Sequence, residues 1–291
     1  MKVTGFSFIK NAVAFQYPIV EAVRSILPLC DEVVIAVGDS TDGTRELVAS
    51  IDPQKIKIID TVWDAGLKEG GRVLAAETDK AFKAVGAEAD WCIYIQGDEV
   101  LHERGYAEVA EAMTRWKDDK QVDGFLFNYL HFYGSFDHVG ASSKWYKNEI
   151  RVVRNDRTIY SYRDAQGFRK GDNKKLKVKK LNAFIHHYGW VREPAAMQAK
   201  QNNFGVYYQN FGPLPDAEKM YTGDFDYSGI DALKKFTGTH PAVMQQRIAK
   251  MNWKFEHDLR YNKIKLKDRF KNAVEAITGK RPFDHNNYKI I

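Results

Sequence analysis

The first part of the chain alternates short apolar runs with amphipathic segments. The apolar runs at 3–9, 33–37, 55–59 and 91–95 have the length and the β-branched and aromatic content of buried strands. Between them, apolar side chains recur every three or four residues, which is typical of one face of a helix, and Pro18 begins one of these helices. Strands that alternate with helices predict βαβ units and a parallel sheet. Such sheets bind ligands at the carboxyl ends of their strands, so the polar loops there are the expected site.

The pattern changes after residue 120. Between 122 and 190, aromatic or aliphatic residues alternate with polar ones, which is typical of antiparallel or mixed strands with one solvated face. From Pro194 the periodicity is helical again, and a last helix is predicted at 266–277. A long helix is also predicted after Pro241, with an apolar face formed by Met244, Ile248, Met251, Phe255 and Leu259. The segment from Gly212 to Gly238 is rich in glycine and aspartate and indicates a lid-like loop.

Composition places the chain among ordinary globular proteins. Of its 291 residues, 44% are hydrophobic and 28% are charged, which does not indicate disorder. The two cysteines, Cys30 and Cys92, are expected to be reduced thiols and not a disulfide framework. No window approaches the roughly 20 apolar residues of a membrane span, and residues 1–15 do not have the pattern of a signal peptide. We therefore expect a soluble, cytoplasmic protein.

Charge is distributed unevenly along the chain. The formal net charge is +6, yet from His240 to the C-terminus 12 Lys and Arg face 5 Asp and Glu. A nearly neutral body argues against a nucleic-acid partner, which needs a basic face on the folded domain. Five cations gather near the start of the last predicted helix: Lys263, Lys265, Lys267, Arg269 and Lys271. They predict peripheral contact with the anionic inner face of a membrane. The alternative is that the apolar face of this helix packs on the domain or on a second subunit of a homo-oligomer, with the lysines in solvent.

Acidic side chains follow two of the predicted strands. The stretch ADWCIYIQGDEVLHE, from Ala89 to Glu103, ends an apolar run in the adjacent acids Asp98 and Glu99. Carboxylate oxygens at the end of a buried strand suit a divalent cation that bridges phosphates; the alternative is a solvated acidic turn. The loop GDSTDGT at 38–44 follows an earlier strand, and Asp42 is the predicted N-cap of the next helix.

These two loops resemble those of family 2 glycosyltransferases, which have the GT-A fold. In that family the first loop reads roughly D-D-x-S-x-D-x-T and the later acidic motif reads D-x-D, where this chain has VGDSTDGT and QGD. The resemblance implies a GT-A-type, Rossmann-like mixed α/β sheet flanked by helices. It implies a catalytic domain over 1–192, with a nucleotide-sugar-binding half at 3–115 and an acceptor half at 120–192, and we predict a helical C-terminal extension at 193–291. A nucleotide-diphosphate sugar is the implied donor, and a divalent cation, Mn²⁺ or Mg²⁺, is the implied cofactor.

The resemblance also implies roles for individual residues. Asp98 matches the last acid of D-x-D and is the predicted metal ligand, with Glu99 behind it or bonded to neighbouring backbone. His187 is predicted to be a second metal ligand, because neutral imidazole suits divalent metals, or a phosphate contact; the alternative is a packed pair with His186. Arginine offers phosphate a planar fork of donors, although Arg192 could instead form a surface ion pair with Glu193. The predicted contacts to the nucleotide sugar are Asp39, Asp42, Arg72, Gln96, Gly97 and Arg192.

Asp164, in the segment SYRDAQG, is the predicted catalytic base. An inverting transfer needs a carboxylate that takes the proton of the acceptor hydroxyl, and Asp137 and Asp123 are the alternatives. We therefore expect a metal-dependent inverting glycosyltransferase that acts on a cell-surface glycan or a lipid-linked acceptor. A non-catalytic nucleotide-sugar or glycan-binding protein stays open, because D-x-D lacks its first acid. A sugar-phosphate nucleotidylyltransferase is a weaker alternative, because FIKNAVAFQYP stands where those enzymes carry G-x-G-x-R.

Overall fold

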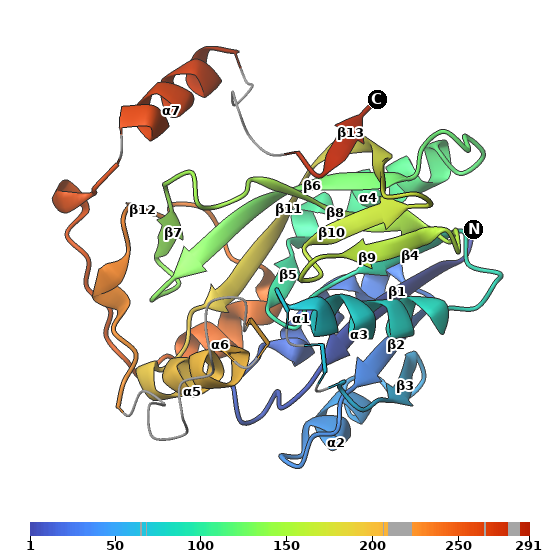
Figure 1. The fold of residues 1–291 in the computed structure, drawn as a ribbon, viewed down its shortest axis with the longest axis horizontal. Helices are drawn as coiled ribbons and strands as arrows, with labels where there is room; N and C mark the ends of the chain where they lie inside the picture. Colours follow the sequence, from blue (N-terminus) through green and yellow to red (C-terminus); the bar gives the residue numbers. More distant parts are fainter. Residues whose placement is uncertain (65, 68, 206, 209–222, 265, 279–285) are drawn as a thin grey trace.

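One mixed sheet runs through the molecule (Figure 1). The structure is a computed structural model, and it describes residues 1–291 except 65, 68, 206, 209–222, 265 and 279–285. The main path of the sheet has the strand order β3-β2-β1-β4-β8-β6-β11-β10-β9. The bounds of these strands are β1 (Val3–Ile9), β2 (Glu32–Val37), β3 (Ile56–Asp60), β4 (Trp91–Tyr94), β6 (Gly124–Tyr133), β8 (Asn148–Arg154), β9 (Ile159–Tyr162), β10 (Gly167–Lys170) and β11 (Lys174–Trp190).

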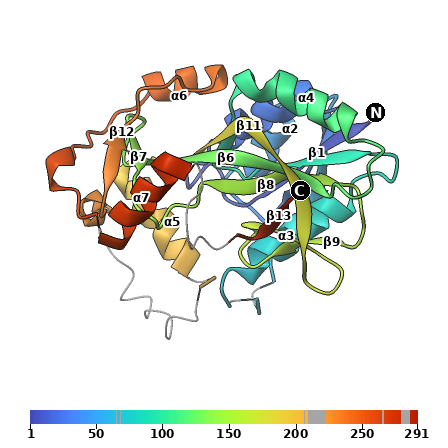
Figure 2. The same ribbon diagram turned by 90° about the horizontal axis from the view of Figure 1, so that it is seen from above.

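The first four strands form the predicted parallel half. β2 and β4 flank β1, and β3 lies outside β2, all in the same direction. Successive residues of β2 enter opposite cores, Val33 and Ile35 on one face and Val34 on the other. Helices cover both faces (Figure 2), which is why β1, β2 and β4 are buried along almost their whole length, whereas the outer strand β3 is partly exposed. The covering helices are α1 (Ile19–Ile26), α2 (Thr44–Ala49) and α4 (Tyr106–Arg115) on one side and α3 (Arg72–Lys83) on the other.

The second half of the sheet is mixed, as the alternating pattern predicts. β8 runs antiparallel to both β4 and β6, whereas β6 and β11 are parallel. The 17-residue strand β11 also pairs with the short strand β5 (Glu99–Leu101), which directly follows the acidic motif. β7 (His138–Gly140) pairs antiparallel with the end of β6, where Val139 is the register partner of Phe132. The predicted architecture, a mixed α/β sheet flanked by helices, is confirmed.

The residues after 192 contribute strands as well as helices. The helices are α5 (Pro194–Gly205), α6 (Gln245–Ala249) and α7 (Leu266–Thr278), while β12 (Leu233–Lys235) pairs with β7 and β13 (Tyr288–Ile290) pairs with β11. Of the predicted lid-like loop at 212–238, residues 212–222 lie outside the described residues, and the described remainder carries the short 3-10 turn Tyr227–Gly229 and β12.

The predicted long helix after Pro241 is wrong, because α6 ends at Ala249. Beyond it the chain is extended, and Met251, Trp253 and Phe255 are half-buried while the residues between them are exposed. These side chains pack against the hydrophobic clusters beside β6 and β11. The segment MNWKFEH therefore has the two-residue period of an extended chain, and its tertiary contacts outweigh the apolar i, i+4 spacing.

The last helix forms as predicted but stands away from the sheet (Figure 1). Its side chains Leu266, Phe270 and Ile277 are 81%, 60% and 86% exposed. These three residues therefore do not pack on the rest of the described chain, which was one alternative for this face. None of the helices in the described ranges is long and apolar enough to cross a membrane.

Candidate functional site

A cleft of about 660 Å³ opens where β1, β3 and β4 end. Loops after these strands reach it together with β11 and α5, as the topology of a parallel sheet requires. Its lining includes Lys10, Tyr17, Trp63, Gln96, Gly97, Asp98, Tyr146, Asp164, His187, Lys200 and Tyr208. The predicted residues Gln96, Gly97, Asp98, Asp164 and His187, which come from three separate parts of the sequence, thus meet in one cleft.

Asp98 is the centre of charge in this cleft. Its side chain is buried, and its carboxylate lies 3.3 Å from Lys200 Nζ and 3.8 Å from Arg192 Nη2. Burial by itself would raise the pKa of Asp98, but the ammonium of Lys200 and its other neighbours, Arg192 among them, together outweigh burial and the pKa falls to about 2. Burial lowers the pKa of Lys200 to about 7, although Asp98 opposes this change. Asp98 is therefore an ionised carboxylate at neutral pH.

His187 presents a nitrogen lone pair to Asp98. The carbonyl of Tyr146 can only accept, so the Nε2 of His131, 2.8 Å away, carries a proton. Burial lowers the pKa of both His131 and His187, so both rings are neutral at pH 7. His131 Nδ1 then accepts, and His187 Nδ1 donates across 3.1 Å. This assignment, made from the hydrogen-bond network, leaves His187 Nε2 unprotonated and 3.7 Å from Asp98 Oδ1, which is the tautomer that binds a metal.

Gly189 keeps the space between these two groups open. A Cβ atom at this position would lie 2.6 Å from His187 Nε2 and 2.9 Å from Asp98 Oδ2. Both distances are below van der Waals contact, so any side chain here would displace the imidazole or the carboxylate. The glycine thus leaves a cradle between one hard oxygen ligand and one imidazole ligand.

The cradle fits a divalent cation that takes its remaining ligands from elsewhere. Within the described part of the chain, no group of three or more His, Cys, Asp and Glu side chains is placed to hold a metal. Mg²⁺ and similar ions are commonly bound by one or two protein groups and complete their shell with substrate phosphates and water. Asp98 and His187 would supply the protein ligands of such an ion.

Glu99 belongs to a buried network behind the cleft. Its two carboxylate oxygens accept from Arg151 Nε and Nη2, both at 2.7 Å, and Oε1 also accepts from the hydroxyl of Tyr129. Oε2 accepts from the backbone N–H of Gln96 at 3.1 Å, which is the neighbouring-backbone bond that we predict for Glu99. Glu99 is therefore engaged in holding the QGD loop to β8, and Asp98 is left to face the cleft.

Arg151→Met is expected to lower the free energy of unfolding by about 3–5 kcal/mol, because it leaves the fully buried carboxylate of Glu99 without its counter-charge. Urea denaturation measures the effect. The matched control is Arg45→Met, which removes an ion pair to Asp60 that is more than half exposed and is expected to cost less than about 1 kcal/mol. Equal losses in the two variants would contradict the importance of the buried pair.

Asp164 lies in the tight turn between β9 and β10 and lines the cleft. Its neighbours Arg163 and Ala165 have φ of 57° and 63°, values that cost non-glycine residues about 1–3 kcal/mol and are often found at functional sites. Tyr208 donates to its carboxylate at 3.4 Å. The alternative bases lie elsewhere: Asp137 is exposed and does not line the cleft, and Asp123 is buried against Lys170 and β11.

Two predicted acids of the loop at 38–44 do not line the cleft. Asp39 is exposed, but it pairs at 2.7 Å with Lys10, which does line it. The N-cap prediction for Asp42 is wrong, because the helix is capped by Gly43 with φ of 81°. Asp42 instead accepts from the N–H groups of Thr44 and Ala14, and so ties this loop to the loop after β1.

The two predicted arginines lie beside the cleft in neighbouring hollows. Arg72 is at the start of α3, pairs with Glu69 at 3.2 Å, and shares a small pocket with Asp164. Arg192 is buried next to Asp98 and lines a second pocket of its own. Within the described ranges its guanidinium makes no hydrogen bond with Glu193, the alternative partner. Contact of either arginine with a nucleotide stays a prediction.

Sequence reasoning missed three residues of this site. Lys200, on α5, gives no local signal, because a single lysine in a polar helix is ordinarily solvated. His131 lies on β6 and Arg151 on β8. Only the pairing of β6 with β11 and with β8 shows that His131 supports His187 and that Arg151 supports Glu99. In the sequence, the only indication of their importance is that they are polar residues within otherwise apolar, buried strands.

Comparison with known proteins gives likenesses of the fold alone. No protein-family model matches the chain, and no curated protein matches it by sequence. It is similar to residues 1–349 of S. aureus TarS, with a TM-score of 0.40 and 15% identity over 75% of this chain and 68% of that one. It is also similar to 4-diphosphocytidyl-2C-methyl-D-erythritol synthase from Anaerococcus prevotii (TM-score 0.39, 10% identity, 71% and 95% covered). Glucosyl-3-phosphoglycerate synthase from Mycobacterium tuberculosis, in complex with Mn²⁺, UDP and phosphoglyceric acid, has a TM-score of 0.31 and 14% identity over 45% and 43%.

Proposed function

We propose that the chain is a glycosyltransferase that uses a nucleotide-diphosphate sugar and a divalent cation, Mn²⁺ or Mg²⁺. The observation that carries this proposal is the pair of ligand atoms, ionised Asp98 and the unprotonated Nε2 of His187, facing one another across the space that Gly189 keeps open. Two buried cations, Lys200 and Arg192, stand beside the pair and suit a diphosphate.

Different residues of the cleft would carry out the separate tasks of an inverting transfer. Asp98 and His187 hold the cation, which when bound stabilises the negative charge on the leaving diphosphate. Lys200 and Arg192 attract the phosphates and keep them beside Asp98. Asp164 takes the proton of the acceptor hydroxyl while the hydroxyl oxygen forms a bond to the anomeric carbon of the donor sugar. The bond from that carbon to the phosphate oxygen breaks, its electron pair leaves with the nucleoside diphosphate, and the proton remains on Asp164.

Calorimetric titration of UDP and GDP with and without Mn²⁺ tests donor binding, and a panel of nucleotide sugars then tests turnover. We expect metal-dependent nucleotide binding and slow release of the sugar to water. Binding without turnover of any donor would favour the non-catalytic alternative, which the amide of Gln96 at the first D-x-D position supports. Release of pyrophosphate from a nucleoside triphosphate and a sugar phosphate would instead mark a nucleotidylyltransferase.

The acceptor that we propose is a cell-surface glycan or a lipid-linked precursor, approached from the cytoplasmic face of a membrane. Support comes from α7, which exposes the apolar side chains Leu266, Phe270 and Ile277 and whose start lies among the cations at 263–271. A helix with an apolar and a basic face lies in the interface of an anionic bilayer. Homo-oligomerisation through the same face is the alternative partner.

We expect the protein to pellet with anionic vesicles at low salt and to be released at high salt, because each basic residue near such a surface contributes about 1 kcal/mol. Phe270→Ser should reduce the pelleted fraction. Val62→Ser, which removes another apolar side chain that is 71% exposed, is the matched control and should not. Equal pelleting with neutral and anionic vesicles would remove the membrane proposal.

A further inference from the structure

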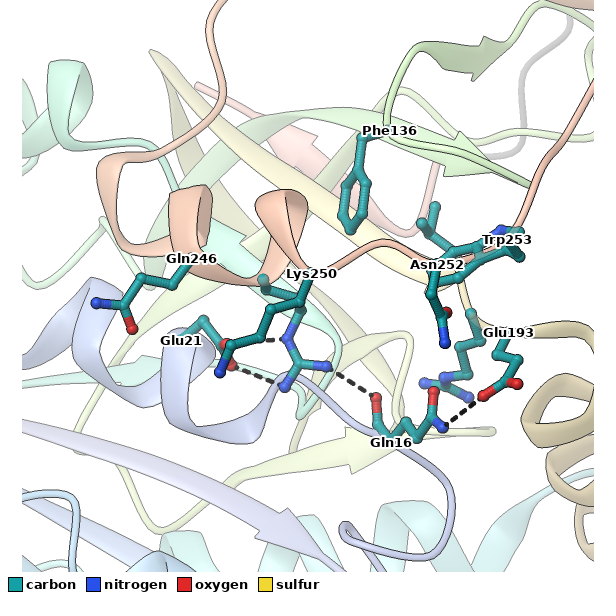
Figure 3. A pocket seen from close by; sticks show the side chains of 11 residues that line it. Gln16, Glu21, Phe136, Glu193, Gln246, Lys250, Asn252 and Trp253 are labelled. Carbon is teal, nitrogen blue, oxygen red and sulfur yellow. Dashed lines mark hydrogen bonds and ion pairs between the residues drawn. The ribbon is translucent and has the colours of Figure 1, made fainter.

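A second pocket, of about 310 Å³ (Figure 3), adjoins the cleft without sharing a lining residue with it. It lies between the loop before α1, the end of β11 and the segment from α6 to Trp253. Its lining includes Gln16, Glu193, Arg192, Lys250, Asn252 and Trp253. These side chains come from three separate parts of the chain, so tertiary packing builds the pocket.

Arg192 connects this pocket to the cleft. Its guanidinium lies 4.2 Å from the ring centre of Tyr17, which lines the cleft, and its Nη2 lies 3.8 Å from Asp98 Oδ2. The last distance allows an ion pair but is too long for a hydrogen bond. The stacked pair of Tyr17 and Arg192 therefore stands between the cleft and the second pocket.

The same guanidinium lacks hydrogen-bond acceptors. Arg192 is 1% exposed, and none of its three guanidinium nitrogens has a hydrogen-bond partner among the described residues. A buried donor without a partner costs about 1–3 kcal/mol, and more when it is charged. An anionic ligand in the pocket would supply the missing acceptors, and a phosphate or carboxylate matches the planar fork of arginine.

The other polar groups of the pocket define what else the ligand carries. Arg247 is neutralised by a bidentate ion pair with Glu21, with bonds of 2.9 and 3.2 Å. Lys250 is exposed and has no ion pair within the described ranges, so its charge adds to that of Arg192. Glu193 accepts from the amide of Gln16 at 3.3 Å (Figure 3) and can accept further bonds from hydroxyl groups.

We propose that this pocket is an acceptor subsite, which binds an anionic group, phosphate or carboxylate, on a hydroxyl-bearing acceptor. The proposal rests on the proposed glycosyl transfer. Arg192 and Lys250 bind the anion, and Glu193 with the amides of Gln16 and Asn252 binds hydroxyls. Because Arg192 also touches Asp98, an acceptor held here is anchored directly beside the donor phosphates.

Inorganic phosphate, titrated calorimetrically at constant ionic strength, tests the pocket. Lys250→Glu reverses the exposed charge, and Lys254→Glu makes the same change four residues on, at an exposed lysine outside the lining. We expect saturable binding to the wild-type protein and to Lys254→Glu, weakened about tenfold or more in Lys250→Glu by the loss of one attraction and the gain of one repulsion. Equal affinity in all three proteins, or no saturable binding to the wild type, would overturn the proposal.

Binding of UDP and GDP with Mn²⁺ to the wild-type protein separates this proposal from the proposed function. Nucleotide binding together with phosphate binding that does not depend on Lys250 leaves the proposed function standing and removes the subsite. Phosphate binding that depends on Lys250, in a protein that binds no nucleotide, overturns the proposed function, and the acceptor role falls with it.

Discussion

Turnover of sugar transfer is expected to fall by about 10³-fold or more in Asp98→Asn, since the several kcal/mol of charge stabilisation that a bound cation supplies would be lost. Asparagine keeps the shape of the side chain but removes its negative charge. The fold should tolerate this change, because Lys200, whose pKa is already lowered to about 7 by burial, can release its proton when the carboxylate is gone. Calorimetric titration with Mn²⁺, the rate of transfer and the melting temperature measure the three effects. Chelation of the metal from the wild-type protein should reproduce the loss of turnover.

Gly189→Ala tests the same site while leaving both ligands in the sequence. Its Cβ would enter the space between His187 and Asp98, so Mn²⁺ affinity should fall as it does in Asp98→Asn. Asp137→Asn, at an exposed acid outside the cleft, is the matched control and should keep wild-type affinity. Unchanged Mn²⁺ affinity in both Asp98→Asn and Gly189→Ala would contradict the metal site.

Asp164→Asn is expected to lower kcat by about 10²–10⁴-fold, the usual range for the loss of a general base. Donor affinity should change little, because the amide oxygen of asparagine can still accept from Tyr208 and hold the turn between β9 and β10. Steady-state kinetics with varied acceptor, together with calorimetric donor binding, separate the two quantities.

Asp123→Asn and Asp137→Asn are the comparisons for this base. Neither acid lines the cleft, so neither variant should lower kcat through the loss of a base. Asp123→Asn also loses its ion pair to Lys170, and any effect should appear in stability and not in kcat. A collapse of donor affinity in Asp164→Asn would instead make Asp164 a donor contact or a structural residue.

The sequence by itself determined the parallel half of the sheet and placed Asp98 after β4, at the edge where the cleft opens. Buried parallel strands are short, apolar on both faces and separated by amphipathic helices, so their pattern is local and can be read without the fold. The position of Asp98 directly after such a strand was sufficient to place it at the binding edge. The same local reasoning predicted a helix at 251–257, which is wrong. The apolar residues there fit both a helical and an extended period, and only packing against the sheet decides for the extended chain.

The tertiary structure alone decided which side chains act together. His131 and His187 are 56 residues apart and meet because they are register partners on the parallel strands β6 and β11. Lys200 reaches Asp98 from α5, and Arg192, just after β11, meets Tyr17, just before α1. Each contact depends on strand register and helix docking, which are set by the packing of the whole core. Local pattern can therefore supply the candidate residues, but the tautomer of His187 and the lack of hydrogen-bond acceptors around the buried guanidinium of Arg192 follow only from their three-dimensional neighbours.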